Sequence, residues 1–156
     1  MNWIARKARD LLELDDSPRA IAMGVGIGTF VGFLPLVGFK TLLAIGGAKL
    51  ARGNLVASAV AVTLHDVLIP LAPFTLLWEY RLGYWMLGDP GHLPATLPET
   101  PHGFAAWMHW STLGEVGLPL PLGAAVVGLI GGAVAGLLLH GLLLRRAARR
   151  RTPVGD

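Results

Sequence analysis

The hydrophobic positions of the chain are gathered into long apolar stretches separated by short polar segments. The clearest stretch runs from Pro119 to Leu144, about 26 residues in which His140 is the only polar side chain. About 20 consecutive apolar residues are enough for a helix to cross the hydrocarbon core of a bilayer. The pattern therefore predicts a transmembrane helix here, followed on the cytoplasmic side by an arginine-rich tail that begins at Arg145.

A second apolar region, 17–54, predicts two helices joined by a turn. Ser17 and Pro18 are typical of a helix start, because serine caps free backbone N–H groups and proline has no donor to lose in the first turn. Pro35 cannot continue the first helix without losing a hydrogen bond, and Gly38 supports a turn.

The two arms of this hairpin are short. At about 1.5 Å per residue, arm 18–34 is about 25 Å long and arm 41–51 about 16 Å, against a hydrocarbon core of about 30 Å. Basic residues flank both outer ends, namely Arg19, Lys49 and Arg52. We therefore expect a re-entrant hairpin, with both ends on the cytoplasmic side and its tip inside the membrane. The alternative is that both arms span fully and Lys40 snorkels to the far interface.

Lys40, at the tip, is the first candidate for function. A lysine near the middle of a bilayer costs roughly 2.5–3.5 kcal/mol, so it is expected to have a partner or to reach water. The next apolar stretch, 54–78, carries His65 and Asp66 near its middle. Asp66 is the expected partner of Lys40, with His65 as a titratable neighbour. We predict a substrate-binding site at membrane depth formed by Pro35, Gly38, Lys40, His65 and Asp66.

Several interpretations of these residues stay open. Lys40 and Asp66 bind a substrate or a proton, or form a purely structural ion pair, or lie apart. The stretch 54–78 is either one span or, broken near Pro70, a second hairpin that mirrors the first, as in transporters built from paired broken helices. No cluster of His, Asp and Glu has metal-site spacing, so neither a metal nor a cofactor is expected.

Two stripes of small residues predict close contacts between helices. The first stripe contains Gly24, Gly28 and Gly32, and the second contains Gly128, Gly132 and Gly136. Small residues at every fourth position let the backbone of another helix approach closely. We expect the second stripe to pack on the first or on a copy of itself, which would form a homo-oligomer.

The remaining segments are expected at the membrane surface. Residues 1–16 predict a cytoplasmic amphipathic helix. Aromatic residues from Trp78 to Trp85 predict an interfacial belt, and 89–118 an external loop with an interfacial helix. Between them lies the membrane core, 17–88, and the chain ends with the transmembrane helix and basic tail, 119–156.

Composition indicates a membrane protein and excludes several other classes. Of 156 residues, 53% are hydrophobic and 15% charged, well below the roughly 25% charged residues of soluble proteins. The absence of cysteine excludes disulfides and thiolate metal sites. The net charge is +3, but the basic residues flank apolar stretches, where anionic lipid rather than nucleic acid explains them.

The order of these motifs resembles a bacterial family of small membrane proteins known as DUF2062. The matching positions are Ser17-Pro18, Ala22, Gly24, Gly28, Phe33, Pro35, Gly38, Lys40-Thr41, Arg52 and Asn54. The likeness covers about 11–88 and, more weakly, the C-terminal helix. His65-Asp66-Val67-Leu68 stands where the family has an Asn-Pro segment, so no role of that segment is carried over. The resemblance implies a polytopic protein of the bacterial inner membrane, in some cases a domain beside glycosyltransferases, and suggests lipid-linked sugar or phosphate chemistry without an established activity.

Taken together, we predict an all-α, polytopic membrane protein with a re-entrant hairpin, two or more transmembrane helices and cytoplasmic termini. The first functional hypothesis is a transporter or lipid-phosphate translocase that binds an anionic, lipid-linked group. The second is a structural scaffold that assembles through its glycine-rich helix faces. An intramembrane enzyme with His65 and Asp66 as acid and base is third. The chain has no nucleophile elbow, phosphate loop or zinc motif to support an enzyme, so a non-enzymatic role is favoured.

Overall fold

A computed structural model describes residues 16–36, 39–67, 72–87 and 118–151, and these residues form helices joined by short connections. The helices are α2 (Pro18–Phe33), α3 (Lys40–Leu50), α4 (Leu55–Asp66), α5 (Ala72–Met86) and α8 (Pro119–Arg151). The all-α prediction is therefore confirmed for the described part. The predicted amphipathic helix of 1–16 and the loop of 89–118 lie outside it, apart from Asp16 and Leu118.

The start and the end of α2 follow local sequence signals. The Ser17 side chain accepts a hydrogen bond from the Ala20 backbone N–H at 3.2 Å, and Pro18 is the first helical residue. The helix ends at Phe33 because Leu34 is already extended and Pro35 has no N–H to offer.

Helix α3 runs back antiparallel to α2, so the two form a helical hairpin. Gly47 lies beside Ile27, and Gly53, after the end of α3, lies beside the backbone of Gly24. Lys40, at the start of α3, reaches the last turn of α2. Near the middle of α3, the Ser58 hydroxyl of α4 donates to the Ala44 carbonyl at 2.9 Å and ties the two helices together.

The turn from α3 to α4 uses the Arg52 and Asn54 positions of the family motif. Arg52 has φ 57°, a left-handed conformation that an L residue adopts at a cost. The backbone N–H of Gly53 donates to the Ala48 carbonyl at 2.8 Å and closes α3. Asn54 then caps α4 by accepting from the Ala57 N–H at 2.7 Å, while its own backbone N–H donates to the Ala20 carbonyl of α2 at 2.8 Å.

The first glycine stripe packs α2 against α4, which runs parallel to it. Gly24 faces Asn54 and Ala57, Gly28 faces Ser58 and Ala61, and Gly32 faces His65. At Gly28 an added Cβ atom would meet the Ser58 carbonyl oxygen and lie 2.8 Å from the Ala61 Cβ atom. The absence of side chains therefore sets how closely the two helices approach.

The second glycine stripe packs α8 against α2, and the two helices are antiparallel. Gly128 faces Phe30, Gly132 faces Gly26, and Gly136 faces Ala22. The prediction that this stripe packs on Gly24, Gly28 and Gly32 is wrong, because α4 already occupies that face. Gly26 is two residues from Gly24, or about 200° around the helix, so it offers the opposite face to α8.

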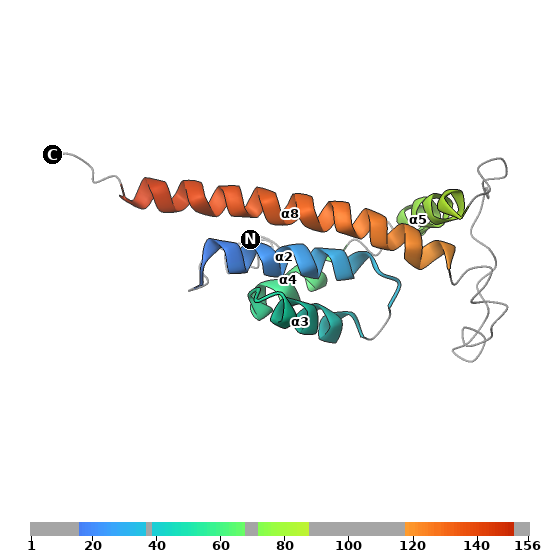
Figure 1. Cartoon of the computed structure of the whole chain (residues 1–156), viewed down its shortest axis with the longest axis horizontal. Coiled ribbons are helices and arrows are strands. Elements are labelled where there is room, and N and C mark those ends of the chain that lie inside the picture. The colour runs from blue at the N-terminus through green and yellow to red at the C-terminus, as the bar shows by residue number, and fades with distance from the viewer. Residues whose placement is uncertain (1–15, 37–38, 68–71, 88–117, 152–156) are drawn as a thin grey trace.

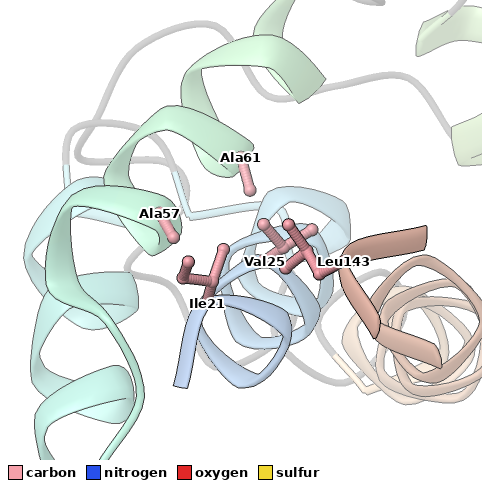
Figure 2. Packing of buried hydrophobic residues seen from close by; sticks show 5 residues of the cluster. All are labelled: Ile21, Val25, Ala57, Ala61 and Leu143. Carbon is pink, nitrogen blue, oxygen red and sulfur yellow. The ribbon is translucent and has the colours of Figure 1, made fainter. Parts of the chain in front are cut away.

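Helix α2 consequently lies between α4 and α8. Ile21 and Val25 of α2, Ala57 and Ala61 of α4 and Leu143 of α8 form one buried cluster, and Figure 2 shows α4 on one side of α2 and α8 on the other. Figure 1 shows that α8 extends past the α2–α3 hairpin at both ends. The core is made of small and medium side chains because the helix axes are close together.

The stretch 54–78 is not one helix. Helix α4 ends at Asp66 and α5 begins at Ala72, so the interpretation as a single span is wrong. Helix α5 packs on the start of α8 rather than back on α4, with Gly83 against the Pro119 carbonyl and Gly123 against the Glu79 carbonyl. A second hairpin that mirrors the first is therefore not formed either.

From Pro119 to Arg149, helix α8 is long and apolar enough to cross a membrane, and among the described helices it alone is so. Helices α2 and α4 are apolar but shorter. Its large apolar side chains are exposed, with Leu129 at 66% and Leu137 at 72% of their full exposure. A core helix of a soluble protein would bury such side chains. The chain thus has at least one candidate membrane helix.

Candidate functional site

Three helix ends meet at one end of the hairpin. Because α2 and α4 are parallel and α3 runs antiparallel to both, the C-terminal ends of α2 and α4 lie beside the N-terminal end of α3. Lys40 is the first residue of α3, and Asp66 is the last residue of α4. The architecture therefore brings the lysine and the aspartate to the same place, although 26 positions separate them in the sequence.

Lys40 makes two contacts among the described residues. Its ammonium donates to the Gly32 carbonyl at 2.8 Å and lies 3.8 Å from the Asp66 carboxylate oxygen Oδ1. Gly32 is in the last turn of α2, where carbonyls lack helical partners, so the lysine also caps the negative end of the helix dipole. The Lys40 side chain is 23% exposed and that of Asp66 43%.

The contacts with described residues use only part of the hydrogen-bonding capacity of the Lys40 ammonium. A partly exposed pair of this kind contributes about 1 kcal/mol or less, and 3.8 Å is too long for a hydrogen bond. An ammonium group has three donors, of which the Gly32 carbonyl takes one. Among the residues that the structure describes, at least one donor of Lys40 therefore has no acceptor.

His65 lies against the end of α2, next to this pair. Its ring and that of Phe33 meet edge to face, with centroids 4.5 Å apart. Gly32 makes room for the imidazole, since an added Cβ atom there would lie 2.6 Å from the His65 Cγ atom. Of the five predicted site residues, the structure brings Lys40, His65 and Asp66 together. Pro35 lies in the connection that follows α2, and Gly38 is outside the described residues.

Glu79 of α5 is a further acidic residue that the sequence did not single out. Its side chain is 2% exposed, and its Oε2 atom is buried with no hydrogen-bond partner among the described residues. Burial raises the pKa of Glu79 to about 7, while the Lys40 ammonium acts in the opposite direction. The Glu79 carboxyl group is therefore close enough to Lys40 for the two charges to interact. The one signal in the sequence is an acidic residue set between two aromatic ones, Trp78 and Tyr80.

The polar side chains at this junction of helix ends are ionisable groups. Within these residues, no group of three His, Cys, Asp or Glu side chains is placed to hold a metal ion. The chemical groups at the site are the Lys40 ammonium, the Asp66 carboxylate and the His65 imidazole. The buried Glu79 carboxyl group of α5 interacts with the lysine electrostatically.

Fold and site together define an all-helical protein with a candidate membrane helix and a polar cluster where helix ends meet. The chain belongs to the DUF2062 family, described as uncharacterized protein conserved in bacteria, whose model matches residues 1–152. The resemblance inferred from the motifs is thereby confirmed, and the match covers more of the chain than those motifs do. The comparisons with curated proteins and with solved structures give no match.

Proposed function

We propose that this chain is a multi-pass protein of the bacterial inner membrane that binds the anionic headgroup of a lipid or lipid-linked substrate at Lys40 and moves it across the bilayer. In this proposal α2, α3 and α4 form a re-entrant unit, α8 spans the membrane, α5 lies at the outer interface, and both termini are cytoplasmic.

Helix lengths support the re-entrant arrangement. Helices α2, α3 and α4 have 16, 11 and 12 residues, or about 24, 16 and 18 Å, against a hydrocarbon core of about 30 Å. Phe30, near the tip, lies beside Gly128 of α8. Helix α8 continues from there to Pro119, about 14 Å further. The tip would therefore stop short of the outer interface that α8 reaches.

The distribution of charge supports the proposed orientation. Arg19, Lys49 and Arg52 lie at the end of the hairpin away from Lys40, and α8 enters its arginine-rich region beyond the same end. An excess of lysine and arginine marks the cytoplasmic side of membrane proteins.

The observation that carries the functional proposal is the Lys40 ammonium at the junction of the helix ends, where the described residues leave at least one of its donors without an acceptor. The first turn of α3 has no side-chain cap, because its N-cap residue is Phe39. The N–H groups of this turn and the positive end of the helix dipole add to the attraction for an anion. Discontinuous helices use such ends to bind anionic groups in transporters. Asp66 then serves as the internal counter-ion that the headgroup displaces.

A lipid-scrambling assay tests the proposal. The protein is reconstituted into vesicles of phosphatidylcholine with a trace of fluorescent NBD-phosphatidylglycerol, and dithionite reduces the probe in the outer leaflet. We expect the wild-type protein to expose the inner-leaflet probe to dithionite, whereas protein-free vesicles protect it. Lys40→Gln is expected to abolish this exchange, since the ammonium that binds the phosphate is lost.

Lys49→Gln is the matched control, because Lys49 lies at the other end of the same helix and is exposed. It is expected to retain exchange. Circular dichroism of each variant in detergent establishes that the helices are intact. Equal exchange by the wild-type protein and Lys40→Gln, with both folded, would refute the proposed role of Lys40.

The scaffold hypothesis has weaker support. The six glycines predicted to drive assembly already contact helices of the same chain. Among the described helical glycines, Gly46 and Gly141 meet nothing within 4 Å, and they do not form a stripe at four-residue spacing. A homo-oligomer therefore needs a face other than the two glycine stripes, and it stays a prediction.

A further inference from the structure

A groove of about 560 Å³ runs between α2 and α8, away from the Lys40 site. Its floor is formed where the two helices touch, by Ala22 and Gly26 of α2 and by Gly132 and Gly136 of α8. Since these residues have little or no side chain, the larger side chains on either side rise above the floor and leave a channel. A volume of this size is typical of sites that hold a small organic ligand.

The walls of the groove are apolar along most of its length. Helix α2 contributes Met23, Ile27 and Phe30, and helix α8 contributes Leu129, Ala133 and Leu137. From Arg19 to Phe30 the groove follows 11 helical residues, or about 16 Å, which is close to half of a hydrocarbon core of about 30 Å. The apolar channel therefore matches the depth of one leaflet of the membrane.

Polar groups are gathered at one end of the groove. Arg19 and His140 both line it, and they share an end because α8 runs antiparallel to α2, with Gly136 beside Ala22. Arg19 is exposed and has no hydrogen bond or ion pair within the part of the chain that the structure describes. The Nδ1 atom of His140 is buried and likewise lacks a partner among those residues. This end lies on the proposed cytoplasmic side.

We infer that this groove binds one anionic glycerophospholipid of the cytoplasmic leaflet, with an acyl chain in the channel and the phosphate between Arg19 and His140. Charge complementarity selects this occupant. A chain of hydrocarbon satisfies the apolar walls, and a phosphate oxygen supplies the acceptor that the Arg19 guanidinium lacks. The site is at the opposite end of α2 from Lys40 and stands whether or not the protein moves lipid.

The test uses the full-length protein in detergent with phosphatidylglycerol that carries a photoreactive diazirine on its acyl chain. Cross-links are mapped to peptides by mass spectrometry. We expect labelling of groove residues such as Met23 and Leu137, and we expect unlabelled phosphatidylglycerol to compete at least ten times better than phosphatidylcholine. Both lipids carry a phosphate, but the choline cation of phosphatidylcholine repels the Arg19 guanidinium, whereas phosphatidylglycerol keeps its net negative charge. A tenfold preference corresponds to about 1.4 kcal/mol.

Two pairs of variants identify the determinants. Arg19→Gln is expected to weaken competition by phosphatidylglycerol about tenfold, while Lys49→Gln, at the same end of the hairpin but outside the groove, leaves it unchanged. Ala133→Phe is expected to fill the channel and abolish groove labelling. Val134→Phe is its control, because Val134 is exposed on the same helix and does not line the groove.

Three outcomes would overturn the inference. Cross-links that lie outside the groove, or groove cross-links that persist in Ala133→Phe, would mean that lipid does not bind there. Equal competition by the two lipids would remove the anionic selectivity. Dissociation of a dimer by Ala133→Phe, with no change in lipid labelling, would assign the groove to a second copy of the chain.

Discussion

Replacing Glu79 by glutamine is expected to stabilise the folded protein at alkaline pH. The residue is 2% exposed, and burial raises the pKa of its carboxyl group from 4.5 to about 7. One pKa unit corresponds to about 1.4 kcal/mol, so ionising Glu79 in the folded protein lowers the free energy of unfolding by about 3 kcal/mol. Glutamine has a similar shape and stays neutral.

The sign of the pH dependence follows from proton binding. Between pH 4.5 and about 7 the folded state keeps the Glu79 proton and the unfolded state has released it. The contribution of Glu79 to the free energy of unfolding is therefore fully present below pH 4.5. It is lost as the pH rises to about 7 and does not change further above that. Glu79→Gln lacks this pH dependence. The difference in the free energy of unfolding between the variant and the wild type should therefore grow across that interval and then level off.

The assay is denaturation followed by circular dichroism in detergent, at a series of pH values from 4.5 to 8. Subtracting the wild-type from the variant free energies isolates Glu79 from other titrating groups. Lys40→Gln provides a second measurement, because the Lys40 ammonium lowers the pKa of Glu79. Without the Lys40 ammonium, the loss of unfolding free energy that the ionisation of Glu79 causes should have its midpoint at higher pH. Parallel pH profiles for the wild type and Glu79→Gln would refute the reasoning.

Three further predictions concern stability and are checked by the same denaturation assay. Gly28→Ala should lower the free energy of unfolding by roughly 1–3 kcal/mol, because the added Cβ atom would meet the Ser58 carbonyl. Gly46→Ala, which enters open space in α3, should raise it by roughly 0.5–1 kcal/mol, and equal effects of the two would contradict the packing described. Arg52→Gly should raise it by about 0.5 kcal/mol, because relief of the left-handed strain exceeds the added chain entropy; a loss would argue against the strain. Ser58→Ala should lower it by about 1 kcal/mol as the bond to the Ala44 carbonyl is lost, and no change would mean that this bond is not a stabilising one.

The local features of the fold could be predicted from the sequence. Ser17, Pro18 and Pro35 act on backbone groups within a few residues, so their effect on the ends of α2 does not depend on the rest of the fold. The proximity of Lys40 and Asp66 could also be predicted, because a charge in an apolar stretch requires a partner. The functional role of this pair stays a prediction.

The features that depend on which helices meet could not be predicted. A four-residue period shows that a helix has a small-residue face, but it does not identify the helix that covers it. The contact of Gly26 with α8 has no periodic signal of its own, because Gly26 lies between two members of the other stripe. The burial of Glu79 has no signal in the sequence either, because it results from the crossing of α5 and α8 at Gly83 and Gly123, which are single glycines without a repeat.

The place of α2 between α4 and α8 has a consequence for biosynthesis. During translation the ribosome releases the hairpin and α4 well before α8 is made. Until then, none of the other helices that the structure describes covers the Ala22 and Gly26 face of α2. The packing around this face of α2 is therefore completed only after α8 has been made.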